Sequence, residues 1–158
     1  MRKWIALLLL AATLLTMPTT AEAKKSFLSK EIQQMCIDVA RRYCLPPELL
    51  MAIVERESGG DPNAIGDGGR AIGLCQIHEC YQLERMERLG IKSLKDPESN
   101  LIVAAEILCE LLDKYEDPRL ALMFYNGQSD AKYRAATGVY SDYANGVEQR
   151  MYELQKGQ

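Results

Sequence analysis

The chain of 158 residues contains one histidine, no Cys-x-x-Cys pair and no excess of positive charge. Zinc sites usually combine two clusters of cysteine and histidine ligands. Cys75, His78 and Cys80 form one such cluster, but the sequence offers no second one. The formal net charge of −3 is not that of a nucleic-acid-binding surface. We therefore expect no metal, no cofactor and no nucleic-acid partner.

Long apolar runs are missing as well. The longest one, residues 4–15, is shorter than the roughly 20 residues that a membrane-spanning helix needs. It follows Arg2 and Lys3 and precedes small residues that end at Ala23. This pattern is typical of a secretory signal peptide. We expect residues 1–23 to be removed and residues 24–158 to form an exported protein without stable membrane insertion.

The sequence has no internal repeat, no low-complexity tract and no linker that would divide residues 24–158, so a single domain is expected. Five cysteines lie in this part of the chain: Cys36, Cys44, Cys75, Cys80 and Cys109. In an exported protein they could form one or two disulfides, and their odd number leaves at least one thiol free. The alternative is that they are reduced and partly buried in the core. The sequence does not give the pairing.

The spacing of apolar residues predicts helices throughout the chain. The first is expected after Ser29, and the second from Pro47 to the Gly59-Gly60 pair. A glycine-rich loop follows as far as Gly73. Further helices are expected at residues 81–90, 98–115 and 118–127, and after Ser141. No segment alternates as a strand does, which predicts a mainly helical fold with at most a minor β element.

Three acidic residues of the second helix differ in their helical phase. At 100° per residue, Glu57 lies within about 60° of the apolar face, whereas Glu48 and Glu55 lie about 160–180° away and are expected in solvent. That apolar face also carries Leu50, Ile53 and Val54. Burial and the helix dipole would both raise the pKa of Glu57, which suits a general acid. The alternative is a glutamate at a frayed helix end, or one paired with Arg56 or Arg70.

Three blocks of sequence occur in an order and spacing that resemble a known family. They are IVERESGGDPNA, GRAIGLCQI and NLIVAAEILCELLDKYEDPRLALMFYNG. The chain is similar over residues 37–154 to the lytic transglycosylases of the soluble-lytic-transglycosylase (SLT) family, which have a goose-lysozyme-like fold. Two positions depart from the family pattern: Cys75 replaces a methionine, and Phe124 stands where alanine is common. The segment 127–138 also matches the family poorly.

The resemblance implies a lysozyme-like domain that cleaves the MurNAc-β-1,4-GlcNAc bond of peptidoglycan and forms 1,6-anhydro-MurNAc. Glu57 would be the single catalytic acid and base. The implied substrate-binding residues are Ser58, Gly73, Leu74, Gln76, Tyr125 and Asn126. The implied partners are peptidoglycan glycan strands, and the implied location is the cell envelope, either the periplasm or the extracellular wall. A monomer is expected.

Several alternatives remain open. A hydrolytic muramidase would result if Asp61 or Asp67 reached across the cleft and activated water, and a non-catalytic glycan-binding module is a third possibility. Gly73 would allow a sugar to approach the backbone. Gln76 could bind an acetamido group or pin the loop. For the helix end at Tyr125-Asn126, the alternative role is capping and packing. His78 is expected at the surface, and three other tyrosines in packing or rim positions: Tyr115, Tyr133 and Tyr143.

Overall fold

A computed structural model describes residues 25–157. The fold is mainly helical with one small sheet, which confirms the predicted fold class. The described helices are α2 (Lys30–Tyr43), α3 (Pro47–Glu57), α4 (Leu83–Leu89), α5 (Pro97–Lys114), α6 (Pro118–Tyr125), α7 (Ala131–Ala136) and α8 (Asp142–Lys156). The expected signal peptide lies outside the described residues. Within 25–157, no helix combines the length and apolar character that crossing a membrane requires.

Helix starts follow the capping signals in the sequence. The Oγ of Ser29 accepts a hydrogen bond from the amide of Ile32 at the start of α2, and Ser141 does the same for Ala144 at the start of α8. Proline occupies the first turn of α3, α5 and α6, where its missing N–H costs nothing. Helix α7 was not predicted. It has only six residues, of which Ala131 alone is buried, so it carries no readable periodicity.

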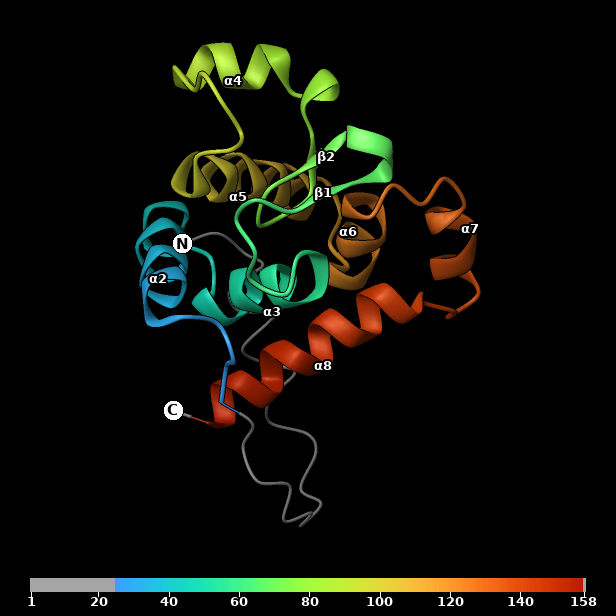
Figure 1. Cartoon of the computed structure of the whole chain (residues 1–158). Coiled ribbons are helices and arrows are strands. Elements are labelled where there is room, and N and C mark those ends of the chain that lie inside the picture. Colours follow the sequence, from blue (N-terminus) through green and yellow to red (C-terminus); the bar gives the residue numbers. More distant parts are fainter. Residues whose placement is uncertain (1–24, 158) are drawn as a thin grey trace.

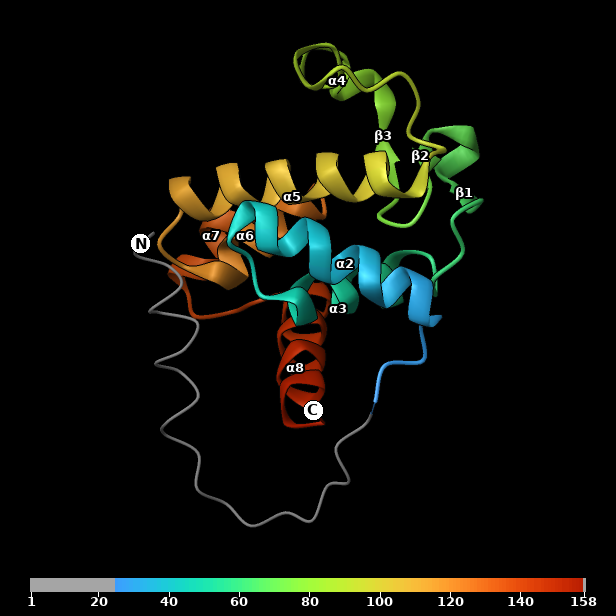
Figure 2. The same cartoon turned by 90° about the vertical axis from the view of Figure 1, so that its left-hand side faces the viewer.

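Helix α5 is the centre of the molecule. It packs against α2 and α6, while α3 packs between α2 and α8. Figures 1 and 2 show α2, α3, α6 and α8 on one side of α5, and α4 with the sheet on the other. The molecule therefore has a helical body, which contains α2, α3, α5, α6 and α8, and a small lobe, which contains the sheet and α4. Helix α5 lies where the two parts meet.

The small lobe contains an antiparallel sheet in the order β1-β2-β3. Its strands are β1 (Ile65–Gly66), β2 (Ala71–Ile72) and β3 (Ile77–His78). Short 3₁₀ turns follow β1 at Asp67–Gly69 and β3 at Glu79–Tyr81. Two-residue strands are too short for alternation to show, so the sequence indicated only that a minor β element was possible.

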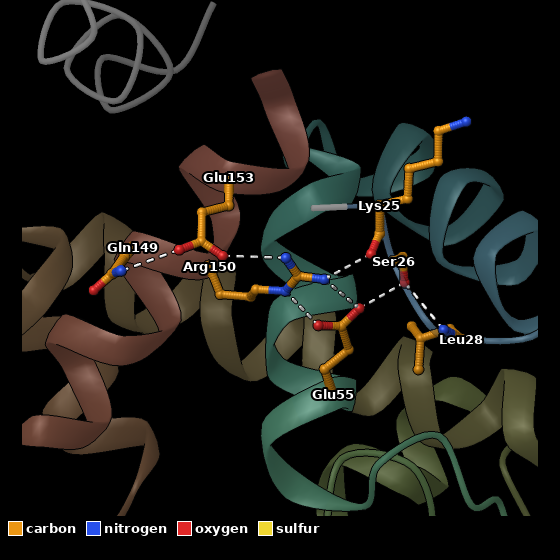
Figure 3. Close-up of polar contacts among 7 residues, drawn as sticks. All are labelled: Lys25, Ser26, Leu28, Glu55, Gln149, Arg150 and Glu153. Atoms are coloured by element: carbon orange, nitrogen blue, oxygen red, sulfur yellow. Dashed lines mark hydrogen bonds and ion pairs between the residues drawn. The ribbon is translucent and has the colours of Figure 1, made fainter. Parts of the chain in front are cut away.

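The prediction that Glu48 and Glu55 face solvent is wrong. Glu48 is 8% exposed and the side chain of Glu55 only 5%, because α3 is covered on nearly all sides. Arg150 of α8 donates from Nε to Glu55 over 2.6 Å, and the hydroxyl of Ser26 donates to the same carboxylate (Figure 3). A second nitrogen of Arg150 donates to the carbonyl of Lys25 over 3.1 Å. This ion pair joins α3, α8 and the segment before α2.

The five cysteines, all in the described residues, form no disulfide. Cys36, Cys75 and Cys109 are buried, whereas Cys44 and Cys80 are exposed. Burial raises the pKa of Cys36 to about 12, so its thiol stays protonated at neutral pH. The buried thiols act as small apolar side chains, as in the reduced-cysteine alternative.

Candidate active site

An open cleft of about 600 Å³ separates the small lobe from the helical body. Its lining comes from β2, β3, the turns that follow β1 and β3, and the start of α4 on one side, and from α3, α5 and α6 on the other. Four of the residues expected from the sequence line it: Glu57, Gln76, Tyr125 and Asn126. A cleft of this size between two lobes is a usual place for an active site.

Glu57 is the last residue of α3, and it lines the cleft. Burial raises the pKa of its carboxyl group, while a hydrogen bond from Tyr143 and the charge of Arg56 lower it again. The net pKa is above the ordinary value of 4.5. Arg70 forms its ion pair with Asp67 (2.9 Å), so it does not neutralise Glu57. The carboxyl group therefore gives up its proton less readily than a carboxyl group in water.

Tyr143 lies in the first turn of α8 and is 7% exposed. Its hydroxyl donates a hydrogen bond of 2.5 Å to Oε1 of Glu57. Burial and the charge of Glu57 raise the pKa of Tyr143, so the phenol stays a neutral donor. The sequence had indicated a packing or rim position. No local pattern links Tyr143 to a residue 86 positions away, so its contact with the carboxyl group was missed.

Gln76 pins the glycine-rich loop as well as lining the cleft. Its Nε2 donates to the carbonyls of Ala64 (3.1 Å) and Gly73 (3.0 Å). Its oxygen lies against Gly66, where an added Cβ would come within 2.3 Å of it. Both amide hydrogens are committed to the backbone, as the loop-pinning alternative requires.

Gly73 lies against the side chain of Asn100, and its missing side chain makes room for this residue. Its φ is +74°, and an added Cβ would lie 2.6 Å from Nδ2 of Asn100. Asn100 is fully buried at the start of α5; its amide donates to the carbonyls of Ile72 and Leu94 and accepts from the amide of Cys75. Asn100 thus fastens the segment between β2 and β3 to α5. Its role was missed, although an asparagine at the start of an apolar helix was the available signal.

Tyr125 and Asn126 lie at the end of α6. The hydroxyl of Tyr125 donates to the carbonyl of Cys75 over 3.3 Å, and burial raises its pKa. Cys75 is buried, and its pKa is also raised, which does not suit a nucleophile. Phe124 lines the cleft and stacks on Tyr115, with ring centroids 4.5 Å apart.

Ser58 and Leu74 are not among the residues that line the cleft. The hydroxyl of Ser58 donates to the carbonyl of Val54 and accepts from the amide of Gly60, which shapes the turn after α3. Leu74 is completely buried. Gly73 does not line the cleft either. Substrate binding by these three residues, as by Gln76, Tyr125 and Asn126, stays a prediction.

Asp67 and His78 both line the cleft, and the side chain of His78 is 32% exposed. Oδ2 of Asp67 lies 3.4 Å from Nε2 of His78. Asp61 accepts a hydrogen bond from the amide of Asn63 in an exposed turn and does not line the cleft. Among residues 25–157, no group of three or more histidine, cysteine or acidic side chains is arranged to hold a metal ion.

Comparison with known proteins gives a consistent result. The family model described as Transglycosylase SLT domain matches residues 34–144. Invasion protein IagB of Salmonella typhimurium is 31% identical over 118 residues, which cover 68% of this chain and 73% of IagB. Protein IpgF of Shigella flexneri is 28% identical over 114 residues, covering 68% and 74%. The transglycosylase of Enterobacteria phage PRD1 is 34% identical over 100 residues, which cover 63% of this chain but 36% of the phage protein.

These matches support a glycan-acting enzyme with a lytic transglycosylase-like function and peptidoglycan as its substrate. The family match covers α3, the sheet, α5 and α6, which build the cleft, and extends to the start of α8. The chain belongs to the transglycosylase SLT domain family.

Proposed function

We propose that the protein cleaves the MurNAc-β-1,4-GlcNAc bond of peptidoglycan as a lytic transglycosylase, with 1,6-anhydro-MurNAc as the product. The observation that carries the proposal is the carboxyl group of Glu57, which lies in the cleft with a raised pKa and one phenolic hydrogen-bond donor. Glu57 acts first as the acid and then as the base.

In the first step, Glu57 transfers its proton to the glycosidic oxygen, and the bond between that oxygen and C1 of the MurNAc unit breaks. The sugar's own N-acetyl group assists this departure. In the second step, the Glu57 carboxylate takes the proton of the C6 hydroxyl, and the C6 oxygen bonds to C1. Glu57 is protonated again, and no water is consumed.

Tyr143 suits both steps of this cycle. When Glu57 is a carboxylate, the phenolic hydrogen bond stabilises the negative charge in a partly buried site. When Glu57 is protonated, the same contact to Oε1 holds the group in one orientation. Tyr143 is therefore a positioning residue for the acid.

A hydrolytic muramidase is the second candidate, because Asp67 lines the same cleft as Glu57 and could activate a water molecule. The Asp67 carboxylate is already engaged by Arg70 and His78, which favours the first proposal. Asp67→Asn and product analysis separate the two mechanisms. Under the proposed mechanism, the Asp67→Asn variant still releases anhydro sugars. Under hydrolysis, the unaltered protein releases products that are heavier by one water.

The direct test is Glu57→Gln, which keeps a hydrogen-bond acceptor for Tyr143 but removes the proton donor. General acid–base catalysis contributes roughly 10²- to 10⁴-fold, so the release of soluble fragments from peptidoglycan should fall by about this factor. Asp61→Asn, an exposed acid outside the cleft, is the matched control and should retain activity. Near-normal cleavage by folded Glu57→Gln would exclude the assignment and favour another acid. Glycan binding without cleavage by the unaltered protein would favour the non-catalytic module.

We also propose that the protein acts in the cell envelope as a monomer. The basic and apolar pattern of residues 1–23 supports export, and peptidoglycan as the substrate requires an envelope location.

A further inference from the structure

The small-lobe wall of the cleft carries an exposed aromatic side chain that the proposed chemistry does not use. Tyr81 is 77% exposed, although its ring lines the cleft. A single exposed aromatic side chain is ordinary on a protein surface. This one, however, lines the same cleft as Glu57, where ligand sites are usually found. The mechanism employs Glu57 and Tyr143 from the helical body, so Tyr81 is left without a role.

Tyr81 is held by a neighbouring ring. Its side chain stacks on the imidazole of His78 with 9° between the ring planes and 5.9 Å between the centroids. His78 in turn lies 3.4 Å from Asp67, whose other oxygen accepts a hydrogen bond of 2.9 Å from Arg70. Asp67, His78 and Tyr81 all line the cleft. The orientation of the flat face of Tyr81 is thus set by a series of contacts on one wall.

We propose that Tyr81, backed by His78, is a stacking platform for one N-acetylhexosamine ring of the glycan strand. In a β-1,4-linked N-acetylglucosamine unit, the ring substituents are equatorial, which leaves a face of C–H groups that matches an aromatic ring. Gln82 and Arg85 of the adjoining segment also line the cleft beside Tyr81, and the Nε of Arg85 donates to Oε1 of Gln82 over 3.1 Å. This subsite rests on the proposed function, because it names a further contact of the same glycan substrate.

Tyr81 would bind a sugar ring without taking part in bond cleavage. It belongs to the small lobe, whereas Glu57 belongs to the helical body across the cleft. Stacking depends on the ring and not on the hydroxyl group. Replacing the ring should therefore weaken substrate binding, and removing only the hydroxyl should not.

The test measures binding of N-acetylglucosamine hexamer, a peptide-free β-1,4 glycan, by calorimetry in the Glu57→Gln background. Tyr81→Ala should weaken binding about tenfold, and Tyr81→Phe should bind as the parent does. Tyr133→Ala is the matched control, because Tyr133 is also 77% exposed but does not line the cleft. In the catalytically intact protein, Tyr81→Ala should raise KM for peptidoglycan with little change in kcat.

Three outcomes would overturn the subsite: equal binding by Tyr81→Ala and its parent, an equal loss in Tyr133→Ala, or no binding of the hexamer by the parent. A defect of Tyr81→Ala seen only with peptide-bearing glycans would also overturn it, since Tyr81 would then contact peptide. Failure of the unaltered protein to cleave peptidoglycan would instead overturn the proposed function, so the two failures are distinguishable.

Discussion

Glu57 and Tyr143 show how one residue's acidity is set by two opposing influences. Burial favours the protonated carboxyl group, and the phenolic hydrogen bond favours the carboxylate. Burial is the larger effect, so the pKa is raised. Under the proposed mechanism this group gives up and regains a proton in each cycle, so both influences bear on its function.

Tyr143→Phe should shift this balance in a defined direction. Without the donor, the carboxylate loses its stabilisation, so the pKa of Glu57 rises further. The protonated form then persists to higher pH, and the alkaline limb of the pH dependence of kcat/KM should move upwards. Lost orientation of the carboxyl group should lower kcat roughly 10- to 100-fold. The measurement is fragment release across a pH series.

Tyr152→Phe is the control for this experiment, because it removes a hydroxyl from the same helix outside the cleft lining. Its pH profile should match that of the unaltered protein. A downward shift of the alkaline limb in Tyr143→Phe would contradict the assigned role of the hydrogen bond.

Helix ends were largely predictable, because serine, proline and glycine act within a single turn. Helices α2, α3 and α8 begin after Ser29, at Pro47 and after Ser141, as the sequence indicated. The strands and α7 escaped prediction because elements of two and six residues show no period. Their positions depend on packing against neighbours that are distant in sequence.

The contact between Gly73 and Asn100, which joins the sheet to α5, depends on the absence of a side chain at Gly73. A side chain there would meet Asn100, whose amide holds the backbone at Ile72, Cys75 and Leu94. The segment that leads to Gln76 is therefore placed by its hydrogen bonds to Asn100 of α5.

Gly73→Ala should cost more stability than a glycine substitution at the same backbone angle in open space. Gly138 provides that comparison, because its φ is +73° and no atom lies within 4 Å of an added Cβ. Gly138→Ala should cost about 1–2 kcal/mol for the left-handed backbone alone. The contact with Asn100 should add about 1–3 kcal/mol in Gly73→Ala. Urea denaturation measures both, and equal losses would show that the contact with Asn100 relaxes without cost.

At the scale of the whole molecule, the largely buried Glu55–Arg150 pair connects α3 with α8 through two residues that are 95 positions apart in sequence. Helical phase correctly separated Glu55 from Glu57, but it could not show that α8 would cover Glu55. The same limit applies to Tyr143 and Asn100, whose partners come from distant segments. Phase and family resemblance therefore located Glu57 and much of the cleft, but not the residues that support it.

Arg150→Ala should leave the Glu55 carboxylate buried without this partner, at a cost of about 3–5 kcal/mol in the free energy of unfolding. The exposed pair of Arg41 and Asp38 provides the control, because Arg41→Ala should change stability by less than about 1 kcal/mol. Chemical denaturation at neutral pH measures both variants. The double variant Glu55→Gln, Arg150→Met should recover much of the loss, and similar instability of single and double variants would contradict the charge argument.

The stack of His78 on Tyr81 has a practical consequence for spectroscopy. His78 is the only histidine in the chain, and it lines the cleft. Without an added affinity tag, the proton NMR spectrum of the unlabelled protein contains one pair of imidazole carbon-bound resonances. Their chemical shifts include the ring current of Tyr81. Any molecule that enters the cleft and displaces either ring should therefore change the chemical shifts of these two resonances.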